Sequence, residues 1–184
     1  MEEKKRLFIS VELPEEVKSE LKRVCDYFAG KDLFVGRCVR PENMHLTLQF
    51  LGSVYENMLP KIDRALKNVS FKICKAKLGQ LDVLPSQKNM RILFADLHAP
   101  QLHRLAKQIE EVLAGIFDAE DREFKNHITI ARIKSIKDKD TFLEQIAQFK
   151  VSPLGFEITE FSLQESELTP EGPIYKTVSS YKLF

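Results

Sequence analysis

The chain has 184 residues, of which 43% are hydrophobic, so it can bury a core of its own and is not a disordered segment. Its 28 basic and 27 acidic residues leave a net charge of +1, which excludes a broadly cationic protein that binds duplexes regardless of sequence. The first residues pass straight from charge into a strand-like pattern, and no apolar run reaches the roughly 18 residues of a membrane span. We therefore expect a cytoplasmic protein with no membrane partner.

The N-terminal half of the chain shows strand-like and helical patterns in turn. Alternating apolar residues end at Pro14, and apolar residues at helical spacing then continue until Gly30. The expected elements are a strand at 7–13, a helix at 14–30, an extended segment at 35–39, the strand that carries His45, a helix at 56–69, and strands at 71–83 and 91–97.

The C-terminal half repeats this order of elements. Its first helix is the clearest amphipathic pattern in the chain. The expected elements are a helix at 101–117, the strand that carries His127, a charged loop, a helix at 141–149, and strands at 155–163 and 175–184. No linker rich in Gly, Ser or Pro separates the halves. We therefore expect a single compact α+β domain over residues 1–184, with two lobes and a groove between them.

The three cysteines, Cys25, Cys38 and Cys74, are odd in number, far apart and without a C-x-x-C pair. This spacing argues against a disulfide framework and against a zinc site. Because free cysteine is among the most buried residue types, we expect all three to be reduced core residues.

Two of the four histidines begin nearly the same pattern, "HLTLQF" at His45 and "HITIAR" at His127. Side chains alternate between the faces of a strand, so each histidine shares a face with the threonine two residues later, Thr47 or Thr129. The aliphatic residues of each pattern point to the opposite, buried face. A histidine that simply bonds a neighbour in the core explains either motif alone, but the matched pair favours a function. We expect the two strands to face each other across the groove.

A pair of imidazoles can act as an acid and a base, because an ordinary pKa of about 6.5 makes both protonation states available near neutral pH. Threonine hydroxyls beside them can donate hydrogen bonds to the oxygens of a phosphoryl group. The sequence has no H-E-x-x-H motif, no Walker-type glycine loop and no G-x-S-x-G elbow. The residues therefore predict phosphodiester chemistry that needs neither a metal nor a cofactor.

Several stretches resemble one known family from end to end of the chain. They are "RLFISVELP", "VRPENMHLTL", "HLTLQFLG", "MRILFADL", "HITIAR" and "SELTPEGPIYKTV". Together they are similar to the two-histidine phosphoesterase superfamily, and within it to the LigT-type RNA 2',3'-cyclic phosphodiesterases, also called 2'-5' RNA ligases. The resemblance implies a bilobal α+β fold with a pseudo-two-fold axis, an antiparallel-rich sheet and helices in each lobe, and both motifs in a central cleft.

The resemblance also implies a reaction, the hydrolysis of a terminal 2',3'-cyclic phosphate of RNA to a 2'-phosphate. In that pattern His45 donates a proton to the departing 3' oxygen and His127 activates water, a choice that the residues alone leave open. Thr47 and Thr129 hold the phosphate oxygens. The reverse reaction joins a 5'-hydroxyl end in a 2'-5' linkage without ATP, because the cyclic ester already carries the activation.

Arg132 is a further candidate for contacting phosphate. Counting by twos from His127 places it on the face of Ile128, so it reaches the site only if the strand ends, twists or bulges. The resemblance favours a phosphate contact, and a surface ion pair is the alternative. Weaker candidates for contacts to ribose or base are Arg40, Arg91 and Tyr175, for which we expect a structural or solvated role instead. A base could stack on Phe34 or Phe94, but we expect both to pack in the core. His98 and His103 lack a threonine partner and are expected to be ordinary.

Two other functions stay open beside the cyclic phosphodiesterase. One is a phosphodiesterase of the same superfamily that acts on 2',5'-oligoadenylate or a small cyclic nucleotide. The other is a non-catalytic module that binds RNA ends. For the first function we expect a monomer whose partner is RNA with a 2',3'-cyclic phosphate end, tRNA halves being one candidate.

Overall fold

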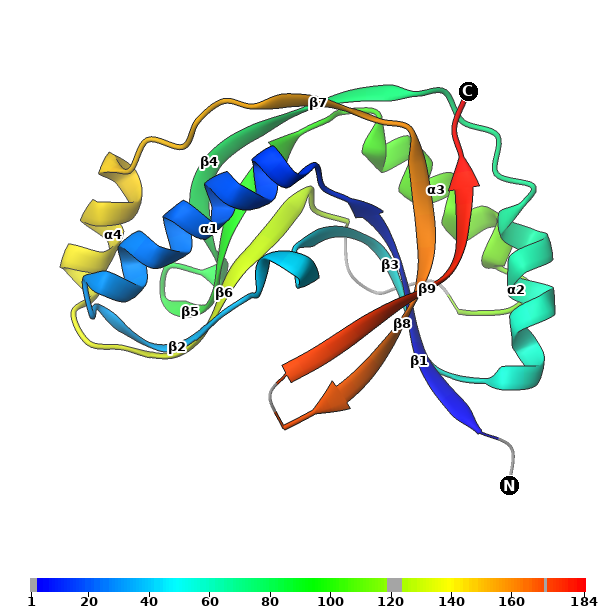
Figure 1. Cartoon of the computed structure of the whole chain (residues 1–184), viewed down its shortest axis with the longest axis horizontal. Helices are drawn as coiled ribbons and strands as arrows, with labels where there is room; N and C mark the ends of the chain where they lie inside the picture. Colours follow the sequence, from blue (N-terminus) through cyan, green and yellow to red (C-terminus); the bar gives the residue numbers. More distant parts are fainter. Residues whose placement is uncertain (1–2, 119–123, 171) are drawn as a thin grey trace.

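A single curled antiparallel sheet runs through the computed structural model, which describes residues 3–118, 124–170 and 172–184 (Figure 1). Its strands are β1 (Lys4–Glu12), β2 (Phe34–Cys38), β3 (His45–Tyr55), β4 (Cys74–Ser86), β5 (Asn89–His98), β6 (His127–Ile136), β7 (Gly155–Ile158), β8 (Glu160–Thr169) and β9 (Gly172–Lys182). The order across the sheet is β7-β4-β5-β6-β3-β1-β8-β9, and β2 pairs with β6 outside this path.

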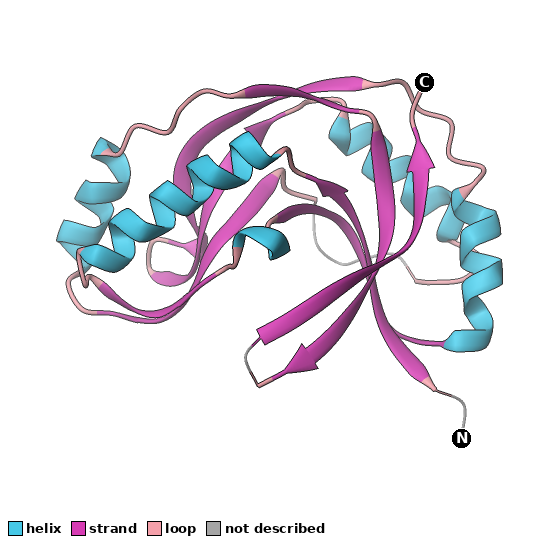
Figure 2. Cartoon of the chain, in the orientation of Figure 1, coloured by secondary structure: helices cyan, strands magenta, loops and turns pink. Residues whose placement is uncertain are grey.

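The described residues contain four α-helices, which lie as two pairs on opposite sides of the molecule (Figure 2). They are α1 (Glu15–Gly30), α2 (Leu59–Leu66), α3 (Leu102–Leu113) and α4 (Lys139–Gln148). Helix α1 packs on β6 and β2, while α3 packs on β3 and on α2. A helix from each half of the chain therefore packs on a strand of the other half. The expected α+β fold with two related halves is confirmed.

The two halves share one sheet because β3 and β6 are hydrogen-bonded neighbours, paired at Leu46 and Ile128. The strands that carry the two histidine motifs thus lie side by side at the centre of the sheet. Our expectation that they face each other across a groove is wrong. Beyond this junction β6 pairs with β2 instead of β3, and the 3₁₀ turn Pro41–Asn43 connects β2 to β3.

The core lies between the sheet and the helices. Leu46, Ile128 and Ile130 are 0% exposed, and they meet helix residues such as Leu21 and Ile109 in the same buried cluster. Each fully buried aliphatic side chain of this size contributes roughly 1.5–3 kcal/mol to folding. The aliphatic face of both histidine strands is therefore fixed, which also fixes the direction of the opposite face.

Some boundaries differ from those expected. The helix expected at 56–69 is shorter, because a 3₁₀ turn at Glu56–Met58 precedes it and Pro60 occupies its first turn. Strand β6 continues to Ile136 because β2 pairs with it there. The strand expected at 155–163 is two strands, since the chain leaves β4 and joins β1 between β7 and β8.

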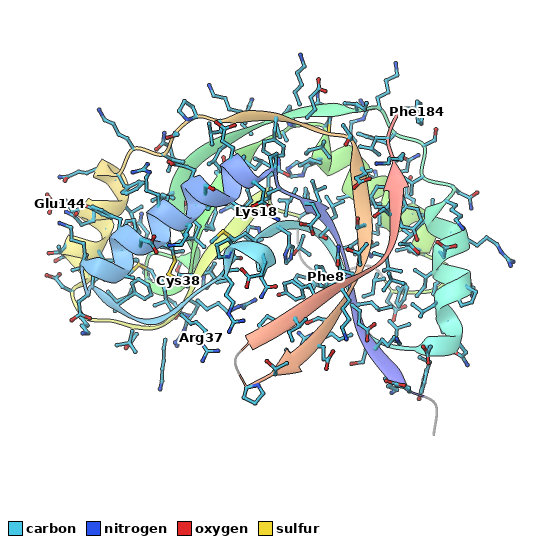
Figure 3. All side chains as sticks on the ribbon, in the orientation of Figure 1. Phe8, Lys18, Arg37, Cys38, Glu144 and Phe184 are labelled. Carbon is cyan, nitrogen blue, oxygen red and sulfur yellow. A yellow bond between two sulfur atoms is a disulfide. The ribbon has the colours of Figure 1, made fainter. Side chains whose placement is uncertain are left out.

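The cysteine expectation is wrong for two of the three residues. Cys25 on α1 and Cys38 at the end of β2 form a disulfide with a Cα–Cα distance of 6.1 Å (Figure 3). They are only 13 residues apart, and the packing of α1 on β2 brings them together. Cys74 is a buried free cysteine, as expected. Among the described helices, none has the length and apolar character to span a bilayer.

Candidate active site

The site lies at the junction of β3 and β6, on the face of the sheet opposite the buried core. Residues that oppose each other in an antiparallel pair point to the same face. Leu46 and Ile128 oppose each other and point into the core, so the residues on either side of them point away from it. His45 then lies across from Thr129, and Thr47 lies across from His127. The four side chains form a square with the two histidines at opposite corners.

His45 is held by contacts on both ring nitrogens. Its Nδ1 donates to the carbonyl oxygen of Asn43 at 2.8 Å, and Nε2 lies 3.1 Å from the hydroxyl of Thr47. The rings of Phe8 and Tyr175 pack against the imidazole, with centroids 4.9 and 5.1 Å away. The carbonyl requires a proton on Nδ1, so a neutral His45 offers its lone pair at Nε2 to the threonine hydroxyl.

Burial lowers the pKa of His45 from 6.5 to about 4. The Asn43 carbonyl acts in the opposite direction, whereas positive charge on Arg132, His127 and Lys18 lowers the pKa further. The ring is therefore neutral near pH 7 in the free protein. The positive charge that lowers this pKa favours an anion beside the ring.

His127 repeats the same design. Its Nδ1 donates to the carbonyl oxygen of Lys125 at 2.8 Å, again two residues before the ring. The ring of Phe94 packs edge to face against it at 5.6 Å, and the Lys125 ammonium lies 4.6 Å from the centre of the Phe94 ring. This tautomer directs the basic Nε2 of His127 away from its own backbone.

Each histidine also has a carboxylate residue across from it on the next strand outward. Glu12 on β1 pairs with His45, and Asp96 on β5 pairs with His127. Sequence reasoning missed this correspondence. The signal was the resemblance of "FISVEL" to "FADL", where a phenylalanine precedes an acid–leucine pair in both halves.

A β-bulge brings Arg132 to the face of the site. Thr129 pairs with Phe94 and Ala131 with the next residue, Leu93, so Ile130 is an extra residue in β6. Ile130 and Ala131 are both fully buried, and the alternation of faces is reversed after them. The condition under which Arg132 could reach the site is therefore met, and its charge acts on both His45 and Tyr175.

Arg132 also borders a basic hollow of about 330 Å³. Its lining is Val35, Gly36, Arg37, Arg132, Ile133 and Lys134. Arg37 on β2 pairs directly with Arg132, which places two like charges across from each other. An anion between the two side chains is attracted by both charges. The Arg132 end of β6 is therefore suited to phosphate groups.

The weaker candidates differ in their surroundings. Phe34 and Phe94 pack against the core, as expected, although Phe94 also supports His127. Tyr175 covers His45, and burial raises the pKa of its hydroxyl. Tyr175 and Phe94 are thus the weaker candidates whose rings contact a motif histidine. Arg91 bonds Asn89 and the carbonyl of Lys134, and so has a structural role. The remaining ones are Arg40, exposed before the 3₁₀ turn, and His98 and His103, which line a hollow beside Asp96.

The described residues contain no group of three or more His, Cys, Asp or Glu side chains that could hold a metal ion. Besides the carboxylates of Glu12 and Asp96, the groups at the site are two imidazoles, two hydroxyls and a guanidinium. This set can move protons and bind an anion.

Comparisons with known proteins agree with this arrangement. A family model described as LigT like Phosphoesterase matches residues 11–94 and again residues 95–175, so each match contains one histidine motif. An RNA 2',3'-cyclic phosphodiesterase of Methanocaldococcus jannaschii is 31% identical over 177 residues, which cover 96% of this chain and 99% of the relative. One from Aquifex aeolicus is 35% identical over 159 residues, 81% of this chain and 82% of the relative. The crystal structure of a Thermus thermophilus protein has a TM-score of 0.79 at 29% identity, covering 96% of this chain and 97% of that one.

Proposed function

Because the chain belongs to the LigT-like phosphoesterase family, we propose that it hydrolyses the terminal 2',3'-cyclic phosphate of RNA to a 2'-phosphate. The names of its relatives from Methanocaldococcus and Aquifex support this substrate. The observation that carries the proposal is the pairing of Leu46 with Ile128, which puts both histidines and both threonines on one face of the sheet. A single phosphorus atom over the centre of that square lies between an acid and a base.

In the proposed mechanism His127 is the base. Its Nδ1 is bonded to the Lys125 carbonyl, so Nε2 takes a proton from water as the water oxygen bonds to phosphorus. The bond from phosphorus to O3' breaks on the opposite side, because attacking and leaving oxygens are roughly in line. His45 gives its Nε2 proton to the departing oxygen, and the phosphate stays on O2'.

His45 must be protonated to act as the acid, although its pKa is about 4 in the free protein. A bound phosphodiester brings a negative charge among His45, Arg132 and His127, and this charge favours the imidazolium form. Binding of the substrate therefore favours the protonated form of His45, which can act as the acid. When Nε2 carries a proton it can no longer accept a bond from Thr47, so that hydroxyl turns to the phosphate.

Thr47, Thr129 and Arg132 are proposed to bind the non-bridging phosphate oxygens and to stabilise the charge that develops on them. Their hydroxyl and guanidinium donors supply what a metal ion supplies in other phosphodiesterases, so we infer that the reaction needs neither metal nor cofactor. The same steps in reverse, with the 5' oxygen of RNA in place of water, form a 2'-5' linkage.

The continuous sheet supports one two-lobed domain over residues 1–184, and one copy supplies both motifs, so we infer that the monomer is active. Cytoplasmic location stays a prediction. The Cys25–Cys38 disulfide is of a kind that is uncommon in the cytoplasm outside hyperthermophiles.

The test is incubation of the protein with a short RNA that ends in a 2',3'-cyclic phosphate, in excess EDTA, followed by identification of the phosphorylated oxygen. The expected product is the 2'-phosphate, formed at an unchanged rate in the chelator. A 3'-phosphate, or activity abolished by EDTA, contradicts the mechanism. Binding of the RNA without turnover supports a non-catalytic module instead, and turnover confined to 2',5'-oligoadenylate supports the related phosphodiesterase.

A further inference from the structure

An open hollow of about 540 Å³ lies at the end of the site beyond His127. Its volume is in the range of sites that bind small molecules, roughly 300–1,000 Å³. The lining residues are Asp96, Leu97, His98, Ala99, Pro100, His103, Phe124, Lys125 and Asn126. They come from the end of β5, the start of α3 and the segment that leads into β6.

The hollow adjoins His127 through two of its lining residues. Asp96 lies directly across from His127 in the β5–β6 ladder. Lys125, whose carbonyl fixes the tautomer of His127, also lines the hollow. A group that occupies the hollow is therefore on the far side of His127 from Thr129 and Arg132.

The corresponding space beyond His45 is covered by the β8–β9 hairpin. Tyr175 of β9 packs against the His45 ring, and the Asn43 side chain donates to the carbonyl oxygen of Pro173 at 2.8 Å. The two halves of the molecule are alike at the histidines but differ here. The end of the site at His45 is covered, whereas the end at His127 lies next to the hollow.

The chemistry of the lining favours an uncharged nucleoside. His103 and Phe124 form an edge-to-face pair with centroids 5.1 Å apart, and such aromatic rings offer a surface on which a base can stack. The Asp96 carboxylate repels phosphate but accepts hydrogen bonds from ribose hydroxyls. Lys125, two residues before His127, also lines the hollow. Its ammonium group can bind the phosphate on the 3' side of such a nucleoside.

We propose that this hollow binds the nucleoside at the 5'-hydroxyl end of an acceptor RNA. The inference rests on the proposed function, in which His127 acts on the attacking oxygen and His45 on the leaving oxygen. In-line geometry then places the cyclic-phosphate RNA at the His45 and Arg132 end and the attacking group at the His127 end. An acceptor whose 5' oxygen replaces water has its ribose and base in the hollow.

The step is a transfer at phosphorus without any cofactor. The 5' oxygen of the acceptor bonds to phosphorus while its proton goes to Nε2 of His127. The bond from phosphorus to O3' of the donor breaks, and O3' takes the proton of His45. The product is a 2'-5' phosphodiester, and the two histidines have exchanged protonation states.

Partition of one donor between water and acceptor tests the subsite. The donor is a short RNA ending in a 2',3'-cyclic phosphate, and the acceptor is a 5'-hydroxyl RNA trinucleotide in varied concentration. The initial ratio of 2'-5' product to 2'-phosphate is measured for the wild type, for His103→Ala and Phe124→Ala, and for Tyr55→Ala as an aromatic control on exposed surface at the end of β3. Donor binding and the fraction of folded protein both cancel in this ratio, so a partial loss of fold in one variant does not change it.

We expect His103→Ala and Phe124→Ala each to lower the ratio about fivefold or more, since a stacked base contributes at least about that factor. Tyr55→Ala retains the wild-type ratio. The subsite is refuted if the wild type makes the 2'-phosphate but transfers nothing to the acceptor, or if both hollow variants keep the wild-type ratio. A wild type that makes no 2'-phosphate even without acceptor refutes the proposed function instead.

Discussion

At the scale of single residues, the site is set by two carbonyl oxygens. Asn43 and Lys125 each accept a hydrogen bond from Nδ1 of the histidine two residues later, at 2.8 Å in both cases. Both imidazoles are therefore the same tautomer, and the proposed function uses Nε2 of each ring. What distinguishes them is their surroundings, because His45 is enclosed by Phe8 and Tyr175, while His127 is bonded to Lys125, which lines a hollow.

The pKa of His45 should respond to an anion in the site. Its value of about 4 in the free protein results from burial and from nearby positive charge, so bound phosphate should raise it towards neutrality. Titration of the ring by NMR, with and without inorganic phosphate at saturation, measures the change. A pKa that stays near 4 with phosphate bound contradicts the proposal that a bound anion favours protonated His45.

Arg132 should affect both substrate and acid. We expect Arg132→Gln to lower kcat/KM about 10- to 100-fold, the value of one or two charge-assisted hydrogen bonds to the phosphate. Because its charge lowers the pKa of His45, the same change should raise that pKa in the free protein. Arg91→Gln, which removes an exposed arginine bonded to Asn89, is the control and should do neither. Unaltered kinetics in Arg132→Gln place Arg132 outside the site.

The residues that the sequence could identify are those whose role follows from alternation along one strand. His45 and Thr47 share a face in any regular strand, and so do His127 and Thr129. Arg132 could be placed only conditionally, because the extra residue at Ile130 depends on the register with β5. Phe8 and Tyr175 could not be identified as neighbours of His45, since they come from strands that join it through the fold.

At the scale of elements, the disulfide ties helix α1 to β2, the strand that continues into β3 through the 3₁₀ turn. Spacing along the chain did not reveal it, since Cys25 and Cys38 match no sequence motif. Their proximity follows from helix α1 crossing to the strands of the other half. The contact of Cys25 Sγ with the Ile130 carbonyl places the bond next to the bulge that positions Arg132.

Removal of this crosslink should destabilise the fold. Closing a loop of 13 residues contributes about 3 kcal/mol in the chain-entropy description. We expect Cys25→Ala/Cys38→Ala to lower Tm in thermal unfolding, and dithiothreitol to lower the Tm of the wild type but not of the double variant. Cys74→Ala is the control for thiol effects, because Cys74 is free and buried. Equal reductant sensitivity in the wild type and the double variant would show that the disulfide is not the cause.

At the scale of the whole molecule, the repeated order of elements predicted two similar halves, and the structure has them. The prediction stopped at their junction. Strands β3 and β6 are separated by more than 70 residues, and no local pattern says that Leu46 pairs with Ile128. This one register makes two half-sheets continuous and converts two strand motifs into one site, so the active site is a property of the complete sheet and of neither half.

The central claim is that His45 and His127 act on opposite sides of one phosphorus atom, and a substrate with sulfur at the 3' bridging position tests it most directly. A thiolate leaves without protonation, so the acid becomes dispensable while the base does not. With the ordinary cyclic phosphate, we expect His45→Ala and His127→Ala each to lose about 10²- to 10⁴-fold in kcat. With the sulfur substrate, His45→Ala should recover most of its rate and His127→Ala should not. Rescue of His127→Ala instead, or equal rescue of both variants, would contradict the account.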